Sequence, residues 1–490
     1  MDGLADELRQ WEGVSRSGGP LEKHRSQVDA VLALLGVGLA DAQARLTDGR
    51  GHEVPGRILD LHHVWDFFRS RLMLRRVRDL RRLLDVSDEL AWQCYGPVLA
   101  LPGTRPKEPP LVAFGRTASP RAHRRGSAYH DLLPRGGIHT REGREAAARL
   151  PFPVIEVPWH FGAQLPALLT VAHETAHHIE DDCDLGDEIR RRVEHADLPQ
   201  KRAVPWARWA GEAFADVCAA VLCGPAYAEV LAELLEPELR TDEADFGGPH
   251  PPPDARVRLA RAAARAAGHP AADPSADNPD RGDPGREDFC CEDPGGRDPG
   301  REDPRRTDSG REGPEGRDLG RKDPRQEHPG GKDPGREGRD GRDPGHEDPG
   351  GEDPDRETAA VAAALLHGGY EGLGGRRLTE LLTPVDAAEV PAGARRLLRG
   401  RASGCRSAAT VLSAAALAFQ SDPLAYDGQG VAERAVSEVL RLRVAGSRAA
   451  PDRDPAYDAE RRRRYAEAGA LLLAALDATP VQGPSRPVSA

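Results

Sequence analysis

Apolar residues recur every three or four positions along the first part of the chain, which is the spacing of a buried helix face. Residues 21–46 show this spacing at Val28, Val31, Leu32 and Leu35. A second stretch of this kind covers residues 55–84. We therefore expect residues 1–87 to form a helical region, in which an antiparallel pair of helices packs on the next part of the chain.

Three short runs after residue 87 have the composition of β-strands. Residues 91–101 and 110–115 are apolar runs bounded by proline and glycine, which predicts two strands. Residues 154–157 form a β-branched run between Pro153 and Pro158. Because proline has no backbone N–H to donate, we expect this third strand at the edge of a sheet.

Helical spacing returns after these runs. One helix is expected to begin between residues 162 and 166 and to continue past residue 177, and a second, long helix is expected over residues 206–235. Short strands and amphipathic helices within one stretch predict a small α+β domain, mainly helical, over residues 88–268.

Residues 269–357 are of low complexity. Nearly every residue is Asp, Glu, Arg, Gly or Pro, and the phrase Asp-Pro-Gly-Arg-Glu recurs with variations. Because few apolar side chains offset the entropy lost on ordering, we expect a disordered linker. Residues 358–480 are again rich in Ala, Leu and Arg and predict a C-terminal helical region, with candidate helices at 358–366, 411–419, 431–444 and 456–476.

Charge and cysteine usage narrow the classes of partner. The net charge of −12 is spread over 490 residues with both signs plentiful, and no basic face predicts nucleic-acid binding. The seven cysteines form no C-x-x-C pair, so neither a zinc ribbon nor a disulfide framework is expected. The N-terminus lacks a signal-peptide pattern, and no apolar run approaches the roughly 18–20 residues of a membrane helix. We therefore expect a cytoplasmic protein that binds no membrane; its oligomeric state stays open.

The segment His173-Glu174-Thr175-Ala176-His177 is the strongest chemical signal in the chain. Two histidines four residues apart on a helix project side by side, because one turn takes 3.6 residues. His173 and His177 can therefore hold one zinc ion, and Glu174 can reach a water on that ion as a general base. The neighbouring His178 points about 100° away around the helix.

A second acidic pattern lies on the next predicted helix, where Glu212 and Asp216 are four residues apart among apolar neighbours. Glu212 is expected as the third zinc ligand, and Asp216 as the acceptor for the free N–H of a ligating histidine. Asp216 as the direct ligand is an alternative. An amphipathic helix with both acids in solvent would give the same pattern.

Together these motifs resemble the gluzincin zinc metallopeptidases, in which H-E-x-x-H is followed on a later helix by E-x-x-x-D. The resemblance implies a zincin-like fold and an extended peptide paired with the strand at residues 154–157. His250, with three prolines and then Arg256 after it, resembles the segment downstream of the third ligand in the M48-like branch. It implies that His250 donates a hydrogen bond to the oxyanion. The same residues would also suit the start of a helix.

The function expected from these residues is hydrolysis of peptide bonds in a peptide or protein substrate. Zn²⁺ would be held by His173, His177 and Glu212, with Glu174 as the base. Two alternatives remain open at this stage. The zincin-like domain could be a non-catalytic scaffold for partner binding, or a zinc hydrolase of a non-peptide amide.

Overall fold

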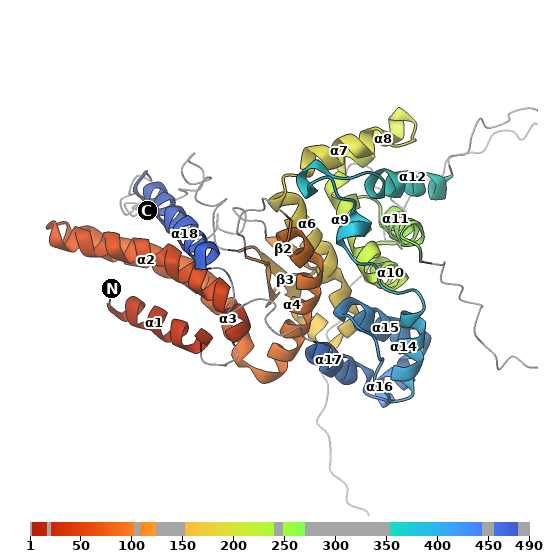
Figure 1. Cartoon of the computed structure of the whole chain (residues 1–490), viewed down its shortest axis with the longest axis horizontal. Coiled ribbons are helices and arrows are strands. Elements are labelled where there is room, and N and C mark those ends of the chain that lie inside the picture. The colour runs from red at the N-terminus through yellow and green to blue at the C-terminus, as the bar shows by residue number, and fades with distance from the viewer. Residues whose placement is uncertain are drawn as a thin grey trace, which may run out of the picture. The chain divides into compact units, whose positions relative to one another are not determined.

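The structure is a computed structural model that describes residues 2–16, 21–101, 108–123, 152–239, 248–269, 353–442 and 455–478. Contacts divide the chain into one unit of residues 1–272 with 352–490 and a second unit of residues 273–351. Nearly all of the expected linker, residues 270–352, lies outside the described residues. The described part is mainly helical with one three-stranded sheet, which confirms the expected mainly helical α+β class (Figure 1).

Four helices form the N-terminal region: α1 (Asp2–Arg16), α2 (Arg25–Thr47), α3 (Val54–Met73) and α4 (Arg78–Leu99). The first predicted helix is confirmed as α2. The second is divided between α3 and α4 by a 3₁₀ turn at Leu74–Arg76. The C-terminal helix α18 (Pro455–Ala478) packs along α2. It crosses at Gly469, where a Cβ atom would lie 2.4 Å from the Leu34 carbonyl oxygen.

The helical stretch Glu22–Thr47 is long and apolar enough, by length and composition, to cross a membrane. The expectation that the chain holds no such run is therefore wrong. In the structure its apolar residues Val31, Leu34 and Leu35 are buried in a hydrophobic core with residues of α1, α3 and α18. A helix buried in a protein core passes the same test, so the absence of a membrane partner stays a prediction.

The prediction of a strand at residues 91–101 is wrong, because residues 91–99 form the second half of α4. Their buried residues recur at helical spacing, at Ala91, Cys94, Tyr95 and Val98. That spacing places all four on one face of a helix, whereas a strand would alternate every second residue. Pro97 lies in the last turn of the helix, where its missing N–H removes only one of the helical hydrogen bonds.

The sheet has the order β1-β3-β2, with β1 at Leu111–Gly115, β2 at Arg121–His123 and β3 at Val154–Pro158. β3 pairs with β1 in parallel and with β2 antiparallel, so the predicted edge strand is the central one. Pro153 and Pro158 lie at the ends of the strand, and the Pro153 carbonyl accepts a hydrogen bond from Leu111 N–H. Because both sides of β3 are paired, an extended peptide cannot add to it.

Alternate residues of the sheet enter two different cores. Ile155 and Val157 of β3 belong to the hydrophobic core that includes the helices α6 and α9. Val154 belongs to the core of the N-terminal helices, together with Leu111 and Ala113 of β1. Successive side chains of a strand point to opposite faces, so the sheet lies between the core of α1, α2 and α3 and the core that contains α4, α6 and α9.

Glu156 of β3 carries a negative charge on the same face of the sheet as Val154. Its carboxylate accepts a hydrogen bond from Arg71 of α3, and its Oε2 lies 3.1 Å from His123 Nε2 of β2. The adjacent His123 imidazole and the charge of Arg71 hold the pKa of Glu156 below its usual range, although burial opposes this. A Cβ at Gly115 would lie 2.7 Å from the same Oε2. The cluster therefore ties β2 and α3 to the central strand.

We expect Glu156→Gln to lower the free energy of unfolding at pH 7 by about 1.5–3 kcal/mol, the usual value of hydrogen bonds to a charged group. A carboxyl whose pKa is lowered by folding stabilises the protein above its unfolded pKa of about 4.3 and loses that contribution as the pH falls. The difference between the two proteins should therefore shrink below about pH 4. Urea unfolding at pH 7 and at lower pH measures it. A difference in unfolding free energy that does not change with pH would contradict this role of the Glu156 charge. Asp187→Asn, which breaks an exposed pair with Arg190, is the control.

The metal-binding segment expected from the sequence lies on α6 (Thr170–Asp182), which two 3₁₀ turns precede at Trp159–Ala163 and Leu165–Leu169. The single long helix expected at residues 206–235 is instead three helices: α8 (Gln200–Arg208), α9 (Ala210–Cys223) and α10 (Pro225–Leu239). Gly224 ends α9 with a φ of +66°, a conformation that favours glycine. α7 (Gly186–Glu194) follows α6, and α11 (Pro253–Ala266) follows α10.

The C-terminal region packs on the same hydrophobic core as α6 and α9. That core includes Val361, Leu365, Leu412 and Ala415 together with Leu168 and Phe214. All four predicted helices are present, within a set that comprises α12 (Pro354–Leu366), α13 (Leu378–Leu381), α14 (Glu389–Leu398), α15 (Ala408–Ser421), α16 (Pro423–Gly428), α17 (Val431–Leu442) and α18. α12 and α15 contact α9, whereas α18 packs on α2 in the other core.

Candidate metal centre

α6 presents the two histidines side by side, as helical spacing requires. His173 Nε2 lies 3.2 Å from His177 Nε2, and the two rings stand at 85° to each other. Both residues are buried, with His173 6% and His177 8% exposed. The apolar residues before and between them, Val171, Ala172 and Ala176, pack into the core and hold this face of the helix inward. His178 is buried as well but does not belong to the cluster.

Glu212 reaches the two histidines from α9, which lies beside α6 (Figure 1). Its Oε2 is 3.5 Å from His173 Nε2, and its Oε1 is 3.5 Å from His177 Nε2. Ligand atoms about 2.0–2.1 Å from a tetrahedral ion lie roughly 3.3–3.4 Å apart. The three side chains therefore have the separations of a metal site, and they form a group that could hold an ion.

Asp216 lies behind the first histidine, one turn beyond Glu212. Its Oδ1 is 2.8 Å from His173 Nδ1, the ring nitrogen on the side away from the cluster. Its oxygens also accept hydrogen bonds from Tyr227 Oη at 2.7 Å and from Arg256 Nε and Nη2 at 2.8 and 2.9 Å. This geometry places Glu212 in the group that could hold an ion and Asp216 beside the outer nitrogen of His173, the relative positions expected from the sequence.

The charges around His173 favour a cation at the cluster. Burial lowers the pKa of His173, but the charge and hydrogen bond of Asp216 and the hydrogen bond to Glu212 outweigh it and raise the pKa to about 10. Burial would also raise the pKa of Glu212, but hydrogen bonds from His173 and His250 hold it well below the usual range. The buried carboxylates therefore stabilise positive charge here, and either a proton or a metal ion can supply it.

Glu174 follows the first histidine on α6 and is 8% exposed. Within the part of the chain that the structure describes, its carboxylate forms no ion pair and accepts no hydrogen bond. It is not among the three converging ligands. The carboxylate is therefore available to a water molecule, as the sequence predicts for a general base.

His250 lies at the edge of the cluster and is the most exposed of the predicted residues. Its side chain is 58% exposed, and its Nδ1 lies 3.3 Å from Glu212 Oε2. The hydrogen bond to Glu212 raises the pKa of His250, although burial opposes it. The sequence resemblance predicts contact with an oxyanion, and the structure places the ring against the carboxylate of Glu212. Arg256, three residues after the prolines, is largely buried and forms an ion pair with Asp216.

Three supporting residues were not assigned their roles from the sequence. Tyr227 and Arg256 complete the hydrogen bonds of Asp216, and Glu180 lies 3.6 Å from His177 Nδ1. The spacing of Glu180, three residues after His177 on the same helix, is the one signal that could have identified it. His160 and His195 do not belong to the cluster. His195 is exposed and contacts the Arg191 carbonyl, and His160 packs edge-on against Phe161.

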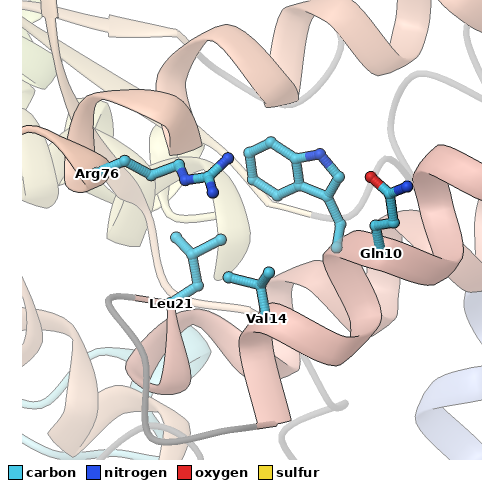
Figure 2. Close-up of a pocket in the computed structure, with 5 residues that line it drawn as sticks. Gln10, Val14, Leu21 and Arg76 are labelled. Atoms are coloured by element: carbon cyan, nitrogen blue, oxygen red, sulfur yellow. The ribbon is translucent and has the colours of Figure 1, made fainter.

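Two other features of the described residues do not belong to this centre. His24, Asp85 and Asp88 form a second buried group of possible ligands. There the guanidinium of Arg75 already supplies the positive charge, since it donates to His24 Nε2 at 2.9 Å and to Asp88 Oδ2 at 2.8 Å. A pocket of about 70 Å³ is lined by residues of the N-terminal region: Gln10, Trp11, Val14, Leu21 and Arg76 (Figure 2).

Comparison with known proteins adds no family to these observations. No protein-family model matches the chain, and no curated protein or solved structure matches it. The chemistry of the centre must therefore be inferred from its own residues.

Proposed function

We propose that this chain is a zinc-dependent metallopeptidase with a zincin-like catalytic domain. The observation that carries the proposal is the convergence of His173 and His177 of α6 with Glu212 of α9, at separations of 3.2–3.5 Å. Two imidazoles and one carboxylate are the ligand set of catalytic zinc in many hydrolases, and they leave a fourth position for water or substrate. The carboxylate of Glu174, next to the first ligand, adds the base that hydrolysis requires.

Zinc bound to these three residues would lower the pKa of a water molecule to about 7 and polarise a carbonyl group. Glu174 would accept a proton from the attacking water as the water oxygen bonds to the amide carbon. It then passes the proton to the leaving amine, so that the C–N bond breaks and the base is regenerated. His250, exposed beside Glu212, is the candidate hydrogen-bond donor to the oxygen that becomes negative.

Asp216 and Arg256 keep this centre in one protonation state. Asp216 accepts the Nδ1 proton of His173, which leaves the Nε2 lone pair for the ion. The two hydrogen bonds from Arg256 balance the buried charge of Asp216 and hold its carboxylate in place. These contacts support a metal site more strongly than a solvated acidic face, because Asp216 is fully buried.

Metal analysis together with a cleavage assay tests the proposal. We expect the full chain to bind about one zinc per molecule and to cleave an unstructured protein such as casein. A chelator should abolish cleavage, and added zinc should restore it. We expect His173→Ala to lose the zinc, whereas the control His195→Ala, an exposed histidine outside the cluster, should retain it.

The outcomes separate the proposal from its alternatives. Zinc binding without cleavage of any peptide substrate would favour a hydrolase of a non-peptide amide. A chain that binds no zinc, and whose His173→Ala variant behaves as the parent protein does, would favour a non-catalytic scaffold.

A further inference from the structure

The second histidine of the centre has an outer ring nitrogen whose partner no motif predicts. His177 Nδ1 is fully buried and has no hydrogen-bond partner within 3.5 Å among the described residues. A histidine that binds a metal through Nε2 almost always donates its Nδ1–H to an acceptor, which sets the tautomer and the direction of the ring. His177 therefore needs an acceptor if it is to match His173, which has Asp216.

Glu180 is the carboxylate placed to accept this proton. Its Oε2 lies 3.6 Å from His177 Nδ1, just beyond hydrogen-bond distance. It follows His177 by three residues on α6, so the two side chains lie on the same face of the helix. The Glu180 side chain is only 12% exposed, which keeps a charge–dipole interaction with the ring from being screened by water.

Gly211 of α9 makes room for this carboxylate. A Cβ atom at position 211 would lie 2.9 Å from Glu180 Oε2 and 3.0 Å from Oε1. Distances under about 3.0 Å are closer than real Cβ contacts, so any larger residue here would displace the carboxylate. Gly211 also precedes the ligand Glu212, and α9 therefore provides both the third ligand and the space for Glu180.

We propose that Glu180 is a positioning residue for the metal centre, which accepts the Nδ1–H of His177 and directs its Nε2 toward the ion. This inference rests on the proposed metal site but not on peptidase activity. Each ligating histidine then has its own carboxylate: Asp216 from the neighbouring helix for His173, and Glu180 from the same helix for His177. A closure of a few tenths of an ångström brings the pair into hydrogen-bond distance.

Zinc affinity, measured by competition with a chromophoric chelator, tests this role in the full chain. We expect Glu180→Ala to weaken zinc binding by about 10–100-fold, the usual loss when an outer partner of a metal ligand is removed. Glu180→Gln keeps an acceptor oxygen of the same reach and should recover most of the affinity. Gly211→Ala should weaken binding in the same direction, because it displaces the carboxylate without removing it.

Asp181→Asn is the matched control, because it removes one exposed negative charge from the adjacent position of the same helix. Its affinity should stay within about twofold of the parent protein. The absorption spectrum of the Co²⁺-substituted protein provides a second readout, since a tilted His177 ring changes the ligand geometry and a remote charge does not.

Unchanged zinc affinity and an unchanged cobalt spectrum in folded Glu180→Ala would overturn the proposal. Circular dichroism and thermal unfolding of each variant in a chelator show whether it is folded. If Glu180→Ala weakens zinc binding but the parent protein cleaves no peptide, the positioning role holds and the proposed peptidase function fails. If the parent protein cleaves peptides and Glu180→Ala binds zinc normally, the peptidase function holds and the positioning role of Glu180 fails.

Discussion

Glu174→Gln is expected to retain its zinc and to lose about 10²–10⁴-fold in kcat/KM, the usual contribution of a general base. Glutamine has the size of glutamate but cannot take a proton from water at neutral pH. Zinc is retained because the three converging ligands are His173, His177 and Glu212, and Glu174 is not among them. Metal analysis and a peptide-cleavage assay on the same preparation measure the two effects together.

Glu194→Gln provides the control for this substitution, because it makes the same change at an exposed position of α7. Its zinc content and activity should equal those of the parent protein. Full activity in zinc-loaded Glu174→Gln would contradict the mechanism. Loss of zinc from the variant would show that Glu174 acts as a ligand, and it would require a different assignment for Glu212.

Asp216→Asn is expected to have the largest effect on stability. The substitution removes the main negative partner of the Arg256 guanidinium, whose side chain is 12% exposed, and leaves it the more distant Glu212 Oε2 at 3.8 Å. Breaking a buried ion pair from one side costs about 3–5 kcal/mol. It also removes the charged acceptor from His173 Nδ1, so zinc affinity should fall by about 10–100-fold. Urea unfolding in a chelator and zinc competition measure the two losses separately.

The double variant Asp216→Asn with Arg256→Met separates stability from metal binding. Methionine removes the buried charge that has lost Asp216, so most of the lost free energy of unfolding should return. The zinc affinity should not return, because His173 still lacks a charged acceptor. Recovery of both properties would contradict a role of Asp216 in orienting His173. Glu229→Gln is the control. It breaks the exposed pair with Arg261 between α10 and α11, and it should cost about 1 kcal/mol or less.

Helical spacing explains why the main residues of the candidate metal centre could be predicted from the sequence. His173, Glu174 and His177 lie within two turns of one helix, and Glu212 and Asp216 lie about one turn apart on another. Helix geometry fixes the relative direction of such neighbours before any tertiary contact forms. The same local rule identified α2 and the main C-terminal helices.

Contacts between distant segments explain the two errors in the predicted strands. The strand at Val154–Pro158 was expected at an edge because of its prolines, but Leu111–Gly115 and Arg121–His123 pair with its two sides. Residues 91–101 resembled a strand by composition, and burial along one face made them helical. Strand order and helix packing depend on which segments meet in space, and local composition does not contain that information.

The sequence by itself determined the residue types of the candidate metal site and their order on two helices. Only the tertiary structure decided which acid faces the histidines. α9 packs on α6 so that Glu212 lies near the Nε2 atoms of both histidines. Arg256 and Tyr227 donate hydrogen bonds to Asp216. The tertiary structure also places Glu180 beside His177, in the space that Gly211 leaves free. The physical reason is that helix geometry sets contacts within about four residues, whereas contacts between helices depend on how their buried faces pack.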